Sequence, residues 1–189
     1  MLRQNFICTW AQNTSPLMQE YHAKEWCQVS HADQYIFEML CLEGYQAGLS
    51  WNTIIEKRAA FREDFYNYDV ERVSAMTSDD IEKLMGDERI IRHRGKLMAT
   101  VSNSKSFIEV QNEFGSFDKY IWSFVNNRQI NDHIRIPEEI HAKTPLSEKI
   151  SNDLKKRGFK FVGPVIVYSF MQAIGLVNDH EIDCMYNPG

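Results

Sequence analysis

The chain has 189 residues, of which 43% are hydrophobic and 25% are charged. Lys and Arg together number 21 and Asp and Glu number 26, which gives a formal net charge of -5. This composition excludes collagen-like, disordered and small disulfide-stapled chains, and the length suffices for one domain that buries roughly 70% of its surface. The acidic balance argues against coating nucleic acid through bulk charge, which needs clustered Lys and Arg.

Helix signals recur from the first third of the chain onward. Apolar periodicity predicts a helix over residues 34–47, and Ser50 is placed to cap a second helix whose apolar positions begin at Trp51. Thr77 and Asp80 have the spacing of a capping box before a third helix. These signals favour helices throughout the first half of the chain.

The second half continues the same pattern. Thr144-Pro145 opens a helix that Gly158 closes, and no run of alternating β-branched residues competes with the helices. We therefore predict an all-α protein with one domain over residues 1–189. Loops are expected near residues 8–15, 86–91, 109–116 and 126–144.

Residues 161–178 contain no charged residue and approach the ~20 residues needed to span a bilayer. Gly163-Pro164 is a helix-start signal, however, and polar residues interrupt the run. A buried core helix from Pro164 to Ile174, closed by Gly175, explains the segment better than a membrane span. Because the N-terminus also lacks the apolar run of a signal peptide, we predict a cytoplasmic protein with no membrane association.

Cysteines and histidines near the two ends of the chain could form a metal site. His180 and Cys184 have three residues between them, and Cys8 and His22 lie near the other end. Two Cys and two His satisfy tetrahedral zinc and leave no open position, as in a structural site. The alternative is that the thiols are unrelated and the histidines are ordinary polar residues. Dispersed cysteines without a His partner are expected to be core thiols, as for Cys27 and Cys41.

Glu43 shares a predicted helix stripe with apolar residues, so its carboxylate would be desolvated. Such an environment is typical of a ligand-binding or acid/base group. Aromatic residues flank it in sequence, namely Trp10, Tyr21, Trp26 and Trp51. Rings around one carboxylate suit a planar ligand with polar edges, such as a nucleobase. The alternatives are a solvated glutamate near Gly44 and aromatic residues that only pack the core.

A basic turn is predicted between the last two helices, where Gly158 and Gly163 bracket a short segment that includes Lys160. The N–H groups at the start of the second helix could bind a DNA phosphate, and neighbouring Lys and Arg side chains supply positive charge. A second cluster of basic residues, Arg89, Arg92, Arg94 and Lys96, could extend this contact. The alternative for either cluster is a solvated helix end.

These residues lie in stretches that resemble the 3-methyladenine DNA glycosylase I family of bacterial base-excision repair. The stretches run from Cys8 to the C-terminus and comprise YHAKEW, FEMLCLEGYQAGLSW, IIRHRGK, WSFVN, LKKRGFKFVG, YSFMQAIGLVNDH and the closing Cys184. The resemblance implies a helix-hairpin-helix glycosylase fold with two helical lobes and the hairpin near residues 147–175. One departure is Met18, which stands where a relative has Tyr.

The resemblance also implies roles for single residues. Glu43 and Tyr21 would act as catalytic residues that hydrogen-bond the flipped base, and Trp51 would stack on it. Trp10 and Trp26 would occupy further pocket positions, and Leu49 would wedge into the DNA. The residues that would grip the DNA backbone are Gly158, Lys160 and Gly163. One structural zinc would be bound by Cys8, His22, His180 and Cys184. Asp179 is a secondary catalytic candidate to which the resemblance assigns no role.

The implied activity is that of a monomeric, monofunctional DNA glycosylase. Such an enzyme flips 3-methyladenine out of double-stranded DNA, hydrolyses the N-glycosidic bond and leaves an abasic site. The rival interpretation is a non-enzymatic, zinc-stabilised module that binds DNA damage. A catalytic zinc hydrolase is disfavoured, because four protein ligands leave no position for water.

Overall fold

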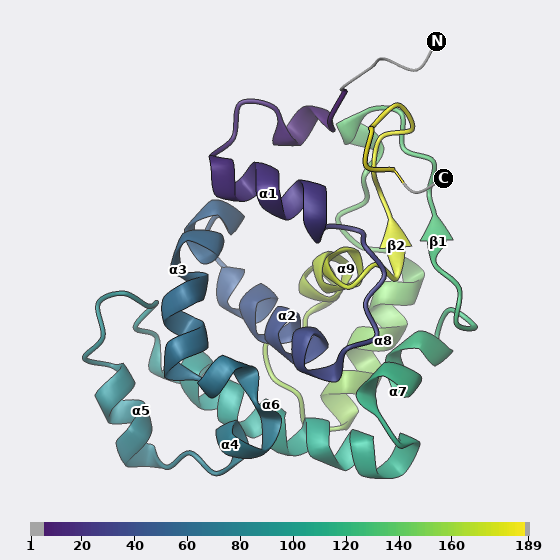
Figure 1. The fold of residues 1–189 in the computed structure, drawn as a ribbon. Coiled ribbons are helices and arrows are strands. Elements are labelled where there is room, and N and C mark those ends of the chain that lie inside the picture. The colour runs from purple at the N-terminus through teal and green to yellow at the C-terminus, as the bar shows by residue number, and fades with distance from the viewer. Residues whose placement is uncertain (1–5, 188–189) are drawn as a thin grey trace.

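The computed structural model describes residues 6–187, which fold almost entirely into helices (Figure 1). The helices are α1 (Pro16–Lys24), α2 (Asp33–Gln46), α3 (Trp51–Asp64), α4 (Val70–Ser74), α5 (Ser78–Leu84), α6 (Arg94–Phe114), α7 (Phe117–Ser123), α8 (Pro145–Lys156) and α9 (Pro164–Ala173). Short 3-10 turns are η1 (Thr9–Ala11), η2 (Tyr66–Tyr68) and η3 (Pro137–Glu139). Across the described residues, the strands are β1 (Ile130–Asn131) and β2 (Val177–Asn178), which pair in parallel. The predicted all-α class is confirmed.

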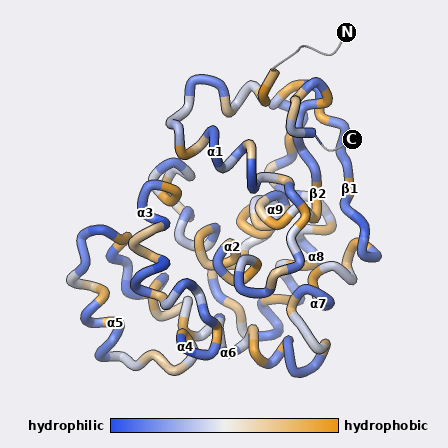
Figure 2. The backbone as a smooth tube through the Cα atoms, in the orientation of Figure 1, coloured by the Kyte–Doolittle hydropathy of each residue, from blue (hydrophilic) through white to orange (hydrophobic). Residues whose placement is uncertain are grey.

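Helix α2 occupies the centre of the molecule. Every residue from Ile36 to Tyr45 is buried, so the helix is covered on all sides, and α9 packs against it. A helix that is surrounded in this way needs apolar residues around its whole circumference. Figure 2 shows the hydrophobic character of α9 at the centre and the hydrophilic character of the peripheral helix α5. The charged residues of this stretch, Glu38 and Glu43, therefore lie inside the protein.

The predicted helix starts are confirmed in atomic detail. The Ser50 hydroxyl accepts a hydrogen bond from the backbone N–H of Thr53 at 3.2 Å and caps α3. Thr77 and Asp80 form a reciprocal capping box at the start of α5. Thr144 caps α8 in the same way. Each cap satisfies N–H groups that a helix start otherwise leaves unpaired.

One predicted loop is wrong. Residues 109–114 continue α6, which has 21 residues and ends only at Phe114. Val110 is buried on this extension, and Gly115 terminates the helix in the left-handed conformation with φ of 88°. The polar residues of the segment had favoured a loop, but burial of one apolar stripe keeps it helical. Of the other three predicted loops, residues 8–15 precede α1 and contain η1, residues 86–91 link α5 to α6, and residues 126–144 link α7 to α8 and contain β1 and η3.

The uncharged segment forms the core helix that the sequence predicts. Helix α9 runs from Pro164 to Ala173, Ile174 follows as its C-cap, and Gly175 has a positive φ of 75°. A Cβ atom at Gly175 would collide with the backbone of Gln28, so glycine is required there. Within residues 6–187, no helix combines the length and the apolar character needed to cross a bilayer.

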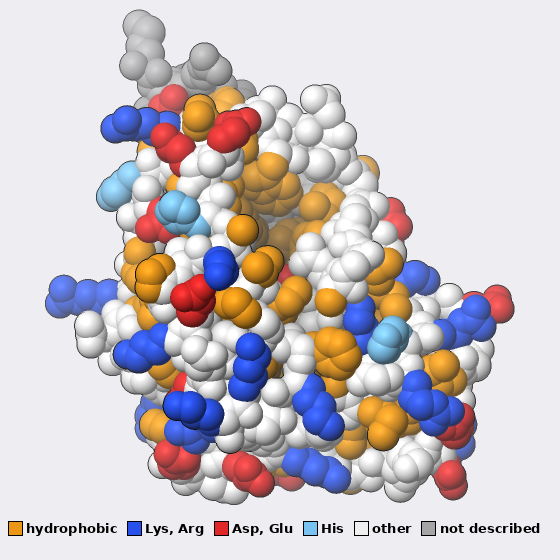
Figure 3. All heavy atoms as spheres, turned by 180° about the vertical axis from the view of Figure 1, so that it is seen from behind, with side chains coloured by type: hydrophobic (Ala, Val, Ile, Leu, Met, Phe, Trp, Pro, Cys, Tyr) orange, Lys and Arg blue, Asp and Glu red, His pale blue; other side chains and the backbone are white. Residues whose placement is uncertain are grey.

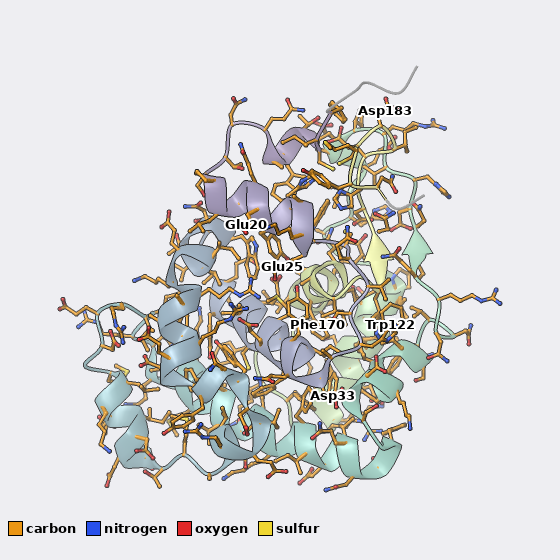
Figure 4. All side chains as sticks on the ribbon, in the orientation of Figure 1. Glu20, Glu25, Asp33, Trp122, Phe170 and Asp183 are labelled. Atoms are coloured by element: carbon orange, nitrogen blue, oxygen red, sulfur yellow. The ribbon has the colours of Figure 1, made fainter. Side chains whose placement is uncertain are left out.

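A partly buried ion network joins α1, α2 and α3. Arg58 donates to Glu38 at 2.8 Å and to Glu25 at 2.8 Å, and Arg62 also donates to Glu38 at 2.6 Å. Burial opposes ionisation of Glu38, but the hydrogen bonds from both arginines outweigh it and lower its pKa. Glu25, labelled in Figure 4, follows α1 and lies between α1 and α2. The network therefore fixes three helices relative to one another.

We expect Arg58→Ala to lower the free energy of unfolding by about 3–5 kcal/mol, because it leaves the buried Glu38 carboxylate with one partner fewer. The matched control is Arg89→Ala, which removes an exposed arginine that pairs with three carboxylates and should change stability far less, because solvent screens exposed ion pairs. Urea denaturation of both variants measures the difference. Equal effects of the two substitutions would show that the network contributes no more than a surface ion pair.

Candidate active site and metal-ligand cluster

A cavity of about 250 Å³ opens between α1, α2, α3 and α9. Figure 3 shows a hollow with hydrophobic walls on the face opposite to the view of Figure 1. The lining residues are Trp10, Met18, Tyr21, Trp26, Glu43, Gln46, Trp51, Ile140, Ser169 and Gln172. The structure thus brings the predicted glutamate, tyrosine and three tryptophans together around one space.

Glu43 is the buried acid of this cavity. Its exposed fraction is 2%, and its Oε2 atom has no hydrogen-bond partner among the described residues. Burial raises the pKa of Glu43 well above its usual 4.5, and no nearby positive charge counteracts it. The alternative of a solvated glutamate at the helix margin is therefore wrong. Such an unpaired carboxyl is costly to bury unless a ligand supplies the partner.

The aromatic walls leave polar groups available as well. The rings of Tyr21 and Trp51 lie 5.4 Å apart at a tilt of 57°, and Trp10 meets Trp26 edge-on at 4.9 Å. The indole Nε1 atoms of Trp10 and Trp51 are buried without a hydrogen-bond partner. Burial, and then the charge of Glu43, raise the pKa of Tyr21, which keeps its hydroxyl protonated and able to donate. The cavity therefore offers flat apolar surfaces together with unpaired donors and one unpaired acid.

Leu49 lies outside the cavity. It follows Gly48, which has a positive φ of 83°, on the turn between α2 and α3, and its exposed fraction is 41%. Its backbone N–H donates to the carbonyl of Gln46 at 2.6 Å, which holds the turn closed. An exposed leucine on such a turn is free to contact a partner. Its role as a wedge into the DNA stays a prediction.

The four predicted metal ligands gather at one point, although they come from the two ends of the chain. Cys8, His22, His180 and Cys184 are all buried, and their ligand atoms lie within 4.8 Å of one another. Tetrahedral zinc with Zn–S near 2.3 Å and Zn–N near 2.0 Å places its ligand atoms roughly 3.3–3.8 Å apart. The measured separations of 3.3 Å from Cys8 Sγ to His180 Nδ1 and 3.7 Å from Cys184 Sγ to His22 Nε2 match this range.

Hydrogen bonds around the cluster orient the ring of His180 and shift the pKa values of the two thiols. His180 Nε2 lies 3.0 Å from the carbonyl oxygen of Trp26, which can only accept, so Nε2 carries the hydrogen and Nδ1 presents its lone pair to Cys8. The hydrogen bond between the two thiols, aided by burial, raises the pKa of Cys8. The same hydrogen bond lowers the pKa of Cys184.

The predicted basic turn connects α8 and α9, which pack against each other. Gly158 adopts a positive φ of 92°, and Gly163 is the N-cap of α9, which has no side-chain cap. Asn103 on α6 holds the exposed Lys160 by its backbone: it accepts from the N–H at 2.8 Å and donates to the carbonyl at 3.0 Å. Ser151 donates to the carbonyl of Val162 at 2.6 Å. The turn is thus pinned from two helices.

The second basic cluster does not form a free basic surface. Arg89 pairs with Glu63 and Asp87, Arg94 pairs with Glu82, and Arg92 lies 3.6 Å from Glu88. The buried Lys96 donates to the carbonyls of Tyr45 and Ala47 and so caps the end of α2. These residues have structural partners, and the extension of a DNA contact through them stays a prediction.

Three polar lining residues, Gln46, Ser169 and Gln172, were not identified from the sequence. The signal was present for two of them, because Ser169 and Gln172 are polar interruptions in an otherwise apolar helix. Asp179, the secondary candidate, is fully buried and accepts from Tyr168 and Gln172, but it does not line the cavity. Cys27 and Cys41 are buried, as expected of core thiols.

A helical protein with an unpaired acid in an aromatic pocket, a pinned basic turn and a Cys/His cluster is similar to known DNA-repair proteins. The family model described as methyladenine glycosylase matches residues 10–187. DNA-3-methyladenine glycosylase 1 of Escherichia coli K12 is 44% identical over 182 residues, which are 96% of this chain and 97% of that protein. DNA-3-methyladenine glycosylase of Haemophilus influenzae is 42% identical over 94% of this chain and 95% of that protein.

Solved structures agree with these matches. A crystal structure of 3-methyladenine DNA glycosylase I has a TM-score of 0.93 at 43% identity and covers 97% of this chain and 100% of its own. A Staphylococcus aureus structure, described as the basis of 3-methyladenine recognition, has a TM-score of 0.93 at 36% identity, with 96% of each chain covered. The chain belongs to the methyladenine glycosylase family. The resemblance inferred from its motifs is confirmed.

The raised pKa of Glu43 predicts a gain in stability on its neutralisation. A carboxyl whose pKa is higher in the folded than in the unfolded state contributes fully to stability below the unfolded value of 4.5, and this contribution is lost progressively as pH rises up to the folded value. We therefore expect Glu43→Gln to raise the free energy of unfolding by about 1–3 kcal/mol at alkaline pH and by less in acid.

Urea denaturation across a pH series measures this difference. The matched control is Glu20→Gln, which changes an exposed glutamate paired with Lys24 and should shift stability far less, because solvent screens that pair. A Glu43→Gln variant no more stable than the parent at alkaline pH would contradict an uncompensated buried carboxyl.

Proposed function

We propose that this protein is a monofunctional DNA glycosylase that excises 3-methyladenine from alkylated double-stranded DNA and leaves an abasic site. The observation that carries the proposal is the unpartnered, buried carboxyl of Glu43 among the rings of the cavity. Family membership supports it, since a related glycosylase variant was solved in complex with 3-methyladenine. The protein is proposed to act as a monomer.

The charge of the lesion explains why an unpaired acid suits the pocket. Methylation at N3 makes the adenine of a nucleotide cationic and weakens its N-glycosidic bond. Ionised Glu43 is costly in the free protein, and a cationic base repays that cost while neutral adenine does not. Binding of the cation draws the raised pKa of Glu43 back down, so recognition and ionisation occur together.

The pocket walls then hold the base for hydrolysis. A base can reach a closed pocket only after it leaves the helical stack, and Leu49 is placed to fill the gap in the DNA. Trp51 stacks on the flipped ring, with Trp10 and Trp26 as further walls, and the Tyr21 hydroxyl donates to its edge. Because the cationic base is already a good leaving group, water can displace it at the sugar carbon without a lyase lysine.

The turn between α8 and α9 is proposed as the helix-hairpin-helix grip on the DNA backbone. Gly158 and Gly163 shape the turn, Lys160 is exposed on it, and the uncapped start of α9 leaves N–H groups to bind phosphate. A short contact of this kind is compatible with a net charge of -5, because it requires local rather than overall positive charge.

Cys8, His22, His180 and Cys184 are proposed to hold one structural zinc per chain. Four protein donors complete a tetrahedral site, and the hydrogen bond from His180 to Trp26 orients its ring as an outer-shell contact does. When bound, the metal supplies folding free energy rather than chemistry. His22 adjoins Tyr21, so the same cluster also fixes the position of a pocket residue.

The glycosylase proposal is tested by incubating the protein with methylated duplex DNA and measuring released bases by chromatography. We expect free 3-methyladenine from the parent protein and a loss of about 100-fold or more in Glu43→Gln, because a charged partner is replaced by a neutral one. Glu20→Gln serves as control, since it makes the same change on the surface. A folded parent that binds the DNA but releases no base would favour a non-enzymatic damage-binding module.

Elemental analysis tests the metal proposal, with one zinc per chain expected. Cys184→Ser should lose the metal and at least about 4 kcal/mol of stability, since structural zinc contributes roughly 10–16 kcal/mol in isolated fingers. Cys41→Ala is the matched control: it removes a buried thiol outside the cluster and should retain the metal. Native protein without zinc, or zinc retained by Cys184→Ser, would refute the assignment.

A further inference from the structure

Gln172 is a buried polar residue of the cavity that has no role in the glycosylase function proposed above. It lies on α9, its exposed fraction is 8%, and it belongs to the cavity lining together with Glu43. Helices α2 and α9 pack against each other, so the two side chains reach the cavity from neighbouring helices. A glutamine buried in an apolar helix needs partners for both ends of its amide.

One end of the amide is fixed by Asp179. Gln172 Nε2 donates to Asp179 Oδ2 at 2.7 Å, and the same oxygen accepts from the Tyr168 hydroxyl at 2.8 Å. Reversal of the amide would place its oxygen against the carboxylate oxygen, where two acceptors repel each other. The orientation of Gln172 is therefore set by a fully buried neighbour and not by solvent.

The other end of the amide has no partner. Within residues 6–187 the side-chain hydrogen bond of Gln172 is made by Nε2, which leaves Oε1 available, and Glu43 Oε2 is buried without a partner. Ser169 also lines the cavity, but its hydroxyl can rotate to donate or to accept and so does not discriminate. Gln46 lines the cavity too, but Gln172 is the lining amide whose orientation a buried carboxylate fixes. Gln172 and Glu43 therefore offer acceptors from neighbouring helices, and the one on Gln172 is held in place.

We propose that Gln172 Oε1 is a specificity-determining acceptor, which with Glu43 binds the exocyclic amino group of the flipped base. This inference rests on the proposed glycosylase function. The amino group of 3-methyladenine has two N–H donors for two acceptors, whereas 3-methylguanine presents a carbonyl oxygen at the same ring position. An acceptor facing acceptors is rejected, and Asp179 acts as the positioning residue that keeps Gln172 from turning over.

The test compares release of 3-methyladenine and 3-methylguanine from one methylated duplex DNA under single-turnover conditions. Gln172→Met keeps the length of the side chain and removes its amide. We expect it to slow release of 3-methyladenine by about 10-fold or more, as for loss of a hydrogen bond to a charged partner, without slowing release of 3-methylguanine. The ratio of the two rates should fall by the same factor.

Gln129→Met is the matched control. Gln129 donates to the carbonyls of Cys27 and Gly175 near the end of α9 but does not line the cavity, so its loss should leave the ratio unchanged. Asp179→Asn leaves Gln172 in place but gives it a partner that tolerates either amide orientation. This variant should also lower the ratio, and it decides the matter if Gln172→Met does not fold.

The outcomes separate the inference from the function on which it rests. A folded Gln172→Met variant with an unchanged ratio of the two rates would overturn the specificity role. Equal slowing for both bases counts as such a result, and it would leave Gln172 a role in hydrolysis or in stability that does not depend on the base. A parent protein that releases neither base would instead overturn the glycosylase function. Denaturation curves of each variant show whether a loss of folding accounts for the change.

Discussion

The structure depends on the cost of keeping one carboxyl, that of Glu43, away from water without a partner. Helix α2 can bury it only because every other face of the helix packs against neighbouring elements, which together stabilise the protein enough to bear that cost. The same isolation keeps the acid available, because any nearby arginine would pair with it and remove the preference for a cationic ligand that we propose for it. Stability and selectivity are therefore opposed at this residue.

The charged residues that do pair are placed where they do not neutralise the pocket. Glu38 lies on the same helix as Glu43, yet Arg58 and Arg62 donate their hydrogen bonds to Glu38 and Glu25 and not to Glu43. Tyr21, Glu43 and Trp51 belong to the three elements that this network joins, so the ion pairs hold the pocket walls in place. Asn103 does the equivalent for the turn between α8 and α9, by pinning the backbone of Lys160 from α6.

Much of this arrangement could be predicted from the sequence, and the reasons differ by residue. Caps such as Ser50 and Thr77 act locally, so their signals survive in the folded chain. The aromatic pocket and the Cys/His cluster were predicted because rare residue types resembled a family pattern. Asn103, Gln172 and the partners of Lys96 could not be found, since each acts through backbone or amide contacts between segments distant in sequence.

The meeting of Cys8 with Cys184 has a consequence for the order of folding during synthesis. Trp10, two residues beyond Cys8, forms part of the cavity wall, and the cluster that anchors it includes residues near the end of the chain. Bringing the two ends of this long loop together costs conformational entropy. The contacts that offset this cost can form only once His180 and Cys184 are present. Before His180 and Cys184 have been synthesised, the chain therefore lacks half of the cluster that lies beside the Trp10 wall of the pocket.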